Sequence, residues 1–254
     1  DYSWGADSIT SVSFNPAESS LLASTGTDRS TCLYDLRVSA PMRKQYMAMK
    51  SNKVIWHPRE PYNFMIGSED ANVYSFDMRY LDKALMVYKD HVSAVMDVAF
   101  SPSGKEFVSG GYDRTIRLFN TNEGRSKDMY HTKRMQRIFS VKFSADAQYV
   151  ISGSDDTNLR IWKAHASDTI GLTQSRKQRK EQTQDALHKK FSHMPEVRRI
   201  VHSKPKPKAI KKATELKKIQ IESQRRKLQN MLKHNKKTTV IQSEKEKAVG
   251  NTLK

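Results

Sequence analysis

Four aspartates recur along the chain at nearly equal intervals, and one has the neighbours that a hydrolytic triad would need. They are separated by 42, 43 and 42 residues: Asp28, Asp70, Asp113 and Asp155. His91 and Ser109 precede Asp113, and a Ser–His–Asp set can support nucleophilic acyl transfer. An aspartate and a serine or threonine recur in every copy, however, whereas the histidine does not. We therefore interpret the four aspartates as structural turn residues, with Asp113 accepting hydrogen bonds from both Ser109 and His91.

Each aspartate lies in the same pattern of short apolar runs. In the third copy the runs cover residues 95–100, 107–110 and 116–119, separated by clusters of Gly, Pro, Asp and Ser. Such a pattern predicts three antiparallel strands. The aromatic that ends each third run keeps the spacing: Tyr34, Phe76, Phe119 and Trp162. A period in the low forties is typical of WD-type propeller blades, so an all-β propeller of four blades is predicted for residues 1–163.

An outer strand completes the first three copies but not the fourth. Outer strands are expected near residues 43–47, 84–88 and 126–130, whereas the chain after Lys163 is polar and basic. In a closed propeller the start of the chain supplies the missing strand. Here residues 1–4 resemble the tail of an earlier blade. Because seven blades are usual, we expect the last four of seven, and low stability for this open segment alone.

The positive charge is concentrated in the second part of the chain. Of the net charge of +18, residues 1–163 carry only +2, from 21 Lys and Arg against 19 Asp and Glu. Residues 164–254 carry +16, from 24 against 8. This asymmetry indicates a polyanionic partner, with nucleic acid favoured over a membrane surface.

The basic region, residues 164–254, is predicted to form an α-helical extension. Helical segments are expected over 176–191, over 195–201 with Pro195 in the first turn, and over 210–234, with 204–208 extended. Phosphate contacts would not read base sequence. A solvated basic helix or a localisation signal remains an alternative. The residues predicted to bind RNA are Arg176, Lys177, Arg179, Lys180, Lys189, Lys190, Arg198, Arg199, Lys204, Lys206, Lys208, Lys211, Lys212, Lys217, Lys218, Arg225, Arg226 and Lys227.

Catalytic and cofactor-binding motifs do not occur in the sequence. There is no G-x-S-x-G, H-E-x-x-H or phosphate-binding G-x-x-x-x-G-K-[ST], and the histidines are scattered. The single cysteine, Cys32, has no internal disulfide partner, which favours a reducing compartment. We therefore expect a non-enzymatic protein without a cofactor, metal or small-molecule substrate, and no membrane partner.

Several segments resemble one family. They are "WGADSITSVSFNP" at 4–16, "YKDHVSAVMDVAFSPSGKEFVSGGYD" at 88–113, "YHTKRMQRIFSVKFS" at 130–144 and "LHKKFSHMPEVRRI" at 187–200. Together they resemble the Sof-type WD-repeat proteins of the small-subunit processome, which are associated with the U3 small nucleolar ribonucleoprotein. The resemblance implies a scaffold in the nucleus and nucleolus that is needed for processing of the 18S ribosomal RNA precursor. Its implied partners are processome proteins, and U3 small nucleolar RNA, the 18S precursor, or both.

The same resemblance implies a second function, because vertebrate-type members are described as substrate receptors of a cullin-type ubiquitin ligase. That role uses a D-x-R box at the end of a third strand. "YDLR" ending at Arg37 and "FDMR" ending at Arg79 match it one repeat apart. These arginines could dock a carboxylate of a ligase adaptor. A local Asp–Arg surface pair is the alternative, and both interpretations stay open.

Overall fold

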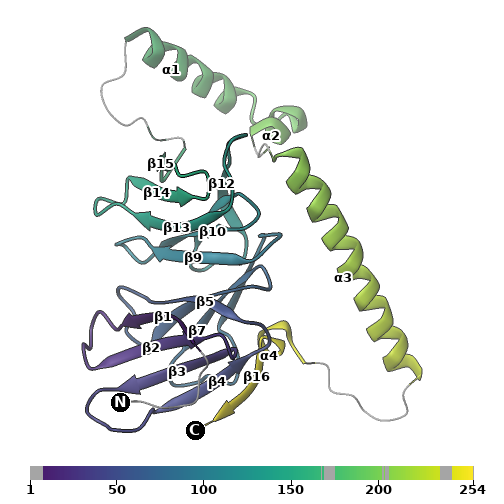
Figure 1. Ribbon diagram of the computed structural model, residues 1–254. Helices are drawn as coiled ribbons and strands as arrows, with labels where there is room; N and C mark the ends of the chain where they lie inside the picture. The colour runs from purple at the N-terminus through teal and green to yellow at the C-terminus, as the bar shows by residue number, and fades with distance from the viewer. Residues whose placement is uncertain are drawn as a thin grey trace.

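The computed structural model describes residues 8–166, 168, 175–201, 203, 206–234 and 242–253. Four antiparallel sheets lie side by side in an arc, α3 (Lys208–His234) runs along one side of it, and α1 (Ser175–Lys190) lies beyond the fourth sheet (Figure 1). The four sheets are the four repeats of the sequence, so each repeat folds as one propeller blade. Residues 1–4, expected to be the tail of an earlier blade, lie outside the described residues.

Each sheet starts with an inner strand and continues outward in chain order. The first sheet contains β1 (Ile9–Phe14), β2 (Leu21–Gly26), β3 (Ser30–Asp35), β4 (Arg43–Met47) and, at its outer edge, β16 (Val249–Leu253). The second contains β5 (Ser51–Trp56), β6 (Asn63–Ser68), β7 (Asn72–Asp77) and β8 (Met86–Lys89). The third contains β9 (Val95–Phe100), β10 (Glu106–Gly111), β11 (Ile116–Asn120) and β12 (Ser126–Tyr130). The fourth contains only β13 (Ile138–Phe143), β14 (Tyr149–Ser154) and β15 (Leu159–Lys163), so the expected absence of an outer strand holds for the described part of the chain.

Side chains of the inner strands connect each blade to the next. The Thr10 hydroxyl donates to the Ser51 carbonyl over 2.9 Å, and the Asn52 amide donates to the Val95 carbonyl over 2.9 Å. In the third blade, the carboxylate of Asp97 accepts from the Val141 N–H at 2.9 Å. These bonds satisfy buried polar groups at each joint and link the inner strand of each blade to that of the next blade.

Apolar side chains fill the space between neighbouring sheets. Between the third and fourth blades, Val108, Ile116 and Leu118 pack with Ile138 and Val141, and all five are buried. Gly110 lies at the same joint, where an added Cβ would approach the Ile138 Cγ2 to 2.6 Å. A glycine is therefore required here by the close approach of two sheets.

The two ends of the arc expose the positions that the inner joints bury. Leu159 and Ile161 of the fourth blade are 79% and 71% exposed, whereas Ile116 and Leu118, one repeat earlier, are 0% and 1% exposed. At the other end, Phe14 is 58% exposed, whereas its counterpart Trp56 is buried. Both outer faces thus have the composition of an inter-blade joint.

Three of the four helices follow the predicted segments of the basic region. They are α1 (Ser175–Lys190), α2 (Pro195–Val201) and α3 (Lys208–His234), and a short fourth helix, α4 (Glu244–Lys247), precedes β16. The expectation that Lys208 lies in extended chain is wrong, because α3 begins there. The N–H of Lys211 bonds to the carbonyl of Pro207, whose fixed φ suits the start of a helix.

Candidate protein and RNA interfaces

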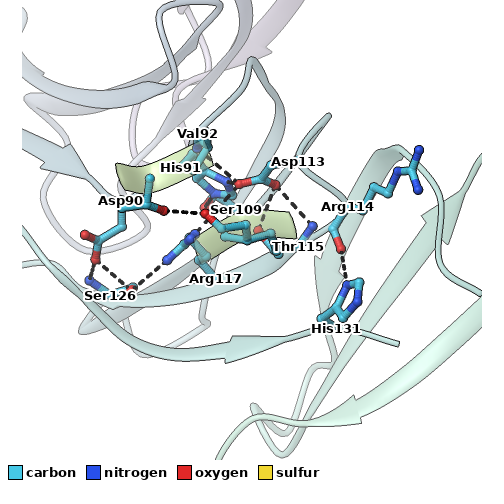
Figure 2. Close-up of polar contacts among 12 residues, drawn as sticks. Asp90, His91, Val92, Ser109, Asp113, Arg114, Thr115, Arg117, Ser126 and His131 are labelled. Carbon is cyan, nitrogen blue, oxygen red and sulfur yellow. Dashed lines mark hydrogen bonds and ion pairs between the residues drawn. The ribbon is translucent and has the colours of Figure 1, made fainter. Parts of the chain in front are cut away.

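The turn aspartate of the third blade is the centre of a buried polar network (Figure 2). The Nδ1 of His91 lies 2.9 Å from the Asp113 carboxylate, and its Nε2 lies 2.6 Å from the Ser109 hydroxyl. Thr115 donates to Asp113 through both its hydroxyl, at 2.7 Å, and its N–H, at 3.1 Å. The expectation of a direct Ser109–Asp113 bond is wrong, because the imidazole of His91 lies between the two residues.

This order of contacts is that of a Ser–His–Asp triad, but the burial favours the structural interpretation. Ser109 is fully buried, and the side chains of His91 and Asp113 are 1% and 3% exposed. A nucleophile must reach its substrate, and the hydroxyl of Ser109 is buried. Burial raises the pKa of the Asp113 carboxyl, but the charge of His91 and the hydrogen bonds from His91 and Thr115 outweigh it and hold that pKa well below its usual range.

Two further charged residues extend the network toward the outer strand. The guanidinium of Arg117 is buried 4.0 Å from Asp113, and it donates to the Ser126 hydroxyl over 3.3 Å. Asp90 accepts from both the N–H and the hydroxyl of Ser126 at 2.8 Å. The network thus links the inner end of the blade to β12.

The turn aspartates of the other blades make related contacts. Asp28 accepts from the Ser30 N–H at 2.9 Å and pairs with Lys44 at 3.5 Å. Asp70 accepts from the Asn72 N–H at 3.0 Å and from the Tyr74 hydroxyl. Each of these aspartates immediately precedes a residue with positive φ. Their carboxylates hold a strained turn.

In the fourth blade the assignment of the turn aspartate to Asp155 is wrong. The residue with positive φ is Thr157, so the equivalent aspartate is Asp156. Its carboxylate accepts from Arg160 at 3.0 Å, whereas Asp155 is exposed and its N–H donates to the Arg137 carbonyl. The sequence offers two consecutive aspartates, and the backbone conformation assigns the turn to the second.

Arg37 and Arg79, the two predicted protein-binding residues, have exposed side chains at matching positions. In both D-x-R boxes the aspartate accepts the N–H of the arginine, at 3.0 Å in the first and 2.9 Å in the second. Arg37 reaches away from its own box, to Glu18 at 2.6 Å and Ser20 at 2.8 Å. Its side chain is 65% exposed.

Arg79 instead forms the local pair that was the alternative interpretation. Its Nε and terminal nitrogen contact the two oxygens of Asp77 at 3.0 and 2.7 Å, and its guanidinium lies 4.4 Å from the centre of the Tyr62 ring. The side chain is nevertheless 56% exposed. A partner could therefore use it only together with Asp77 and Tyr62.

The predicted RNA-binding residues lie on the helices and, with two exceptions, are exposed. Lys204 lies outside the described residues, and Lys217 is half-buried. The exposed ones on and before α1 to α3 are Arg176, Lys177, Arg179, Lys180, Lys189, Lys190, Arg198, Arg199, Lys206, Lys208, Lys211, Lys212, Lys218, Arg225, Arg226 and Lys227. No side chain of α1 or α2 is buried.

Helix α3 runs alongside the blades and contacts them through Lys217. The ammonium of Lys217 donates to the carbonyl of His91 over 3.0 Å, next to the buried network of the third blade. Burial lowers the pKa of Lys217, and the charges of Asp70 and Asp113 oppose this shift. A cleft of about 600 Å³ lies between α3 and the second and third blades, lined among others by Asp70, Tyr112 and Leu216. Lys217 therefore contacts the propeller, which the sequence could not show because Lys211, Lys212 and Lys218 of the same helix are also lysines.

One structural contact has no signal in the sequence pattern. Residues 249–253 form a strand on the first blade, although they lie far from the repeats along the chain. Arg117 is buried at a strand position where the fourth blade has Arg160, so a repeated pattern could have found it, although the first two blades have Cys32 and Tyr74 there. Within the described residues, no group of three His, Cys, Asp or Glu could hold a metal ion.

Blades built on a repeated Asp turn, followed by a basic helical region, define a WD-repeat propeller protein with an added C-terminal domain. The model of the WD domain, G-beta repeat, matches residues 3–35, 82–120 and 129–163. The matched segments omit residues 36–81, which nevertheless form most of the second blade. The model of the Sof1-like domain matches residues 164–249. The chain thus belongs to the Sof-type WD-repeat proteins.

Curated proteins are similar to this chain over its whole length. Protein SOF1 of Saccharomyces cerevisiae is 46% identical over 254 residues, which is 100% of this chain and 52% of that protein. DDB1- and CUL4-associated factor 13 is 48% identical in Danio rerio and 44% identical in Homo sapiens, over 98% and 99% of this chain. Those matches cover 56% and 57% of the two relatives. The chain spans about half the length of the relatives it matches.

No helix in the described ranges is both long and apolar enough to cross a membrane.

Proposed function

We propose that this chain is part of a non-catalytic scaffold of the small-subunit processome, located in the nucleolus and needed for processing of the 18S ribosomal RNA precursor. In this proposal the propeller binds processome proteins, and the basic helices bind U3 small nucleolar RNA, the 18S precursor, or both. The blades are the last four of seven.

The exposed basic surface of the helical region carries the proposal. Most of the charge of +16 in residues 164–254 lies on α1, α2 and α3, and apart from Lys217 the lysines and arginines of these helices are exposed. Apart from Lys217, the predicted RNA-binding lysines and arginines that the structure describes are exposed and can reach phosphates. The Sof1-like match covers this same region, and the relative named SOF1 is similar over the whole chain.

RNA binding across a salt titration tests the proposal. Lys211, Lys212 and Lys218 are exposed on α3, so replacing them with Glu should weaken binding to unrelated RNAs alike. Each lost phosphate contact should flatten the dependence of log K on log salt by about 0.7 on single strands. Arg59, Lys83 and Lys105, exposed on the propeller, provide a control with the same change of charge.

Three results would contradict the proposal. Equal loss of affinity in both triple variants would mean that only net charge matters. Unchanged binding in the α3 variant would favour a solvated basic face or a localisation signal. Loss of binding to one RNA alone would indicate base readout.

A second candidate function is that of a substrate receptor of a cullin-type ubiquitin ligase. Relatives named DDB1- and CUL4-associated factor 13 favour it, as do the two exposed arginines at matching positions. Both arginines already have a carboxylate partner, Glu18 for Arg37 and Asp77 for Arg79, and Arg37 is the better candidate because its side chain is the more exposed. Replacing Arg37 and Arg79 with Ala should reduce the capture of a ligase adaptor and leave RNA precursor processing intact. The reverse outcome would assign both arginines to the scaffold.

A further inference from the structure

The outer edge of the first blade is covered by the C-terminal strand. β16 pairs antiparallel with β4, with Val249 opposite Met47, Thr252 opposite Gln45 and a register shift between Val249 and Asn251. An unpaired outer strand exposes a row of N–H and C=O groups that another strand can bind. Here the row is paired by a segment that lies about 200 residues further along the chain than β4.

The residues just before β16 contact the second blade as well. The N–H of Ala48 donates to the Ala248 carbonyl over 2.9 Å, and the N–H of Ala84 donates to the Lys245 carbonyl over 3.1 Å. The ammonium of Lys245 donates to the Leu85 carbonyl. The segment therefore lies across the joint between the first and second blades.

Apolar burial and one ion pair fix the segment at this joint. Ala248 is 3% exposed and packs in a cluster that includes Met47 and Ala84, with Val249 against it. Lys89 at the end of β8 forms an ion pair with Glu244. The hydrogen bond from Lys89 is the main cause that lowers the pKa of Glu244, so this carboxylate is ionised at neutral pH.

The segment is also structured in itself. The Ser243 hydroxyl accepts from the Glu246 N–H at 3.3 Å, and the Glu246 carboxylate accepts from the Ser243 N–H at 2.8 Å. This reciprocal capping box starts α4 next to β8. A turn of defined geometry therefore leads the chain into β16.

We propose that the outer edge of β4, together with the adjoining end of β8, is a binding site for an extended peptide strand, and that residues 243–253 of the same chain occupy it as a latch. The latch holds the far end of the helical region on the propeller, while its near end is held by β15. The basic helices then form an arm that is fixed at both ends. This proposal does not depend on RNA binding.

A charge swap in the otherwise unchanged protein tests the latch. Lys89→Glu or Glu244→Lys alone should break the ion pair and increase amide hydrogen exchange in β4 and β16 by about 1.4- to 5-fold, the range for exposed ion pairs. The double variant restores an ion pair of opposite sense and should restore protection. Lys247→Glu is the control, because Lys247 is exposed on the same helix and the ion pair stays intact. Unchanged exchange in both single variants would overturn the proposal.

A binding experiment in trans tests the site itself. A labelled peptide of residues 242–254 should bind saturably to a variant that lacks residues 243–254, and it should restore protection of β4. The same peptide with Pro in place of Asn251 and Thr252 lacks two N–H groups and should bind at least tenfold more weakly. Equal binding of both peptides, or no binding of either, would contradict a strand-binding edge. RNA affinity enters neither measurement, so the latch and the RNA proposal can fail separately.

Discussion

A single buried carboxylate holds together several parts of the third blade. Asp113 contacts His91 from the segment before β9 and Thr115 from the turn before β11, and Arg117 lies close by. Each of these groups would lose a partner if the carboxylate were removed, and a buried polar group without a partner is costly. The need to satisfy buried polar groups, rather than catalysis, therefore explains why these side chains lie together.

Asp113→Ala should lower the free energy of unfolding of the intact protein by about 1–3 kcal/mol. Asp155→Ala is the matched control, because Asp155 is exposed. It should change stability by less than about 0.5 kcal/mol. Thermal unfolding of both variants measures the difference, and an equal effect of the two would contradict the turn assignment.

The pH dependence of Asp113→Asn tests the charge of this carboxylate. The pKa of Asp113 is depressed in the folded state. Its contribution to stability is therefore present above the unfolded value of about 3.9, and it is lost as the pH falls toward the folded pKa. The stability difference between wild type and Asp113→Asn should thus be constant near neutral pH and shrink below about pH 4. Denaturant unfolding at several pH values measures it, and a difference independent of pH would show that the charge does not contribute.

At the scale of elements, the order of strands and helices could be predicted from the sequence, but their docking could not. The alternation of apolar residues around each Asp turn predicted the blade strands, the helical spacing of apolar residues predicted α1 and α3, and Pro195 predicted the start of α2. The latch strand had no such signal, because "VGNTL" is short and its partner β4 is remote in sequence. Strand pairing at that distance depends on tertiary geometry, which local patterns do not contain.

Two adjacent lysines on α3 differ in their surroundings: one contacts the propeller and the other is exposed. Lys217 donates to the His91 carbonyl and is half-buried, whereas Lys218 is exposed. Lys217→Ala should therefore lower stability by about 0.5–1.5 kcal/mol and leave the salt slope of RNA binding unchanged. Lys218→Ala should leave stability unchanged and flatten that slope by about 0.7 on single-stranded RNA. Unfolding and RNA binding are measured on both variants. Equal behaviour of the two variants would contradict the docking of α3 through Lys217.

At the scale of the whole molecule, both ends of the arc present surfaces built for a neighbouring blade. Ile151, Leu159 and Ile161 stand one repeat after Val108, Ile116 and Leu118, which are buried against the fourth blade. A contiguous exposed apolar face of this kind indicates a contact surface. The relatives are about twice as long as this chain, and we propose that a further blade of the same protein covers each face.

Two glycines one repeat apart provide the test of that proposal. Gly110 packs against the fourth blade, where an added Cβ would lie 2.6 Å from Ile138 and 2.8 Å from Val141. Gly153 is the equivalent residue at the open face, where an added Cβ would meet only Leu159 of its own sheet, at 3.6 Å. Overpacking a joint costs about 1–3 kcal/mol, so Gly110→Ala should destabilise both this chain alone and the protein with all its blades. Gly153→Ala should be tolerated in this chain alone and become as costly as Gly110→Ala once a further blade is present. The measurement is the unfolding of both variants, once in this chain alone and once in the protein with all its blades. If Gly153→Ala does not lower stability in either protein, no blade packs on the open face of the fourth sheet.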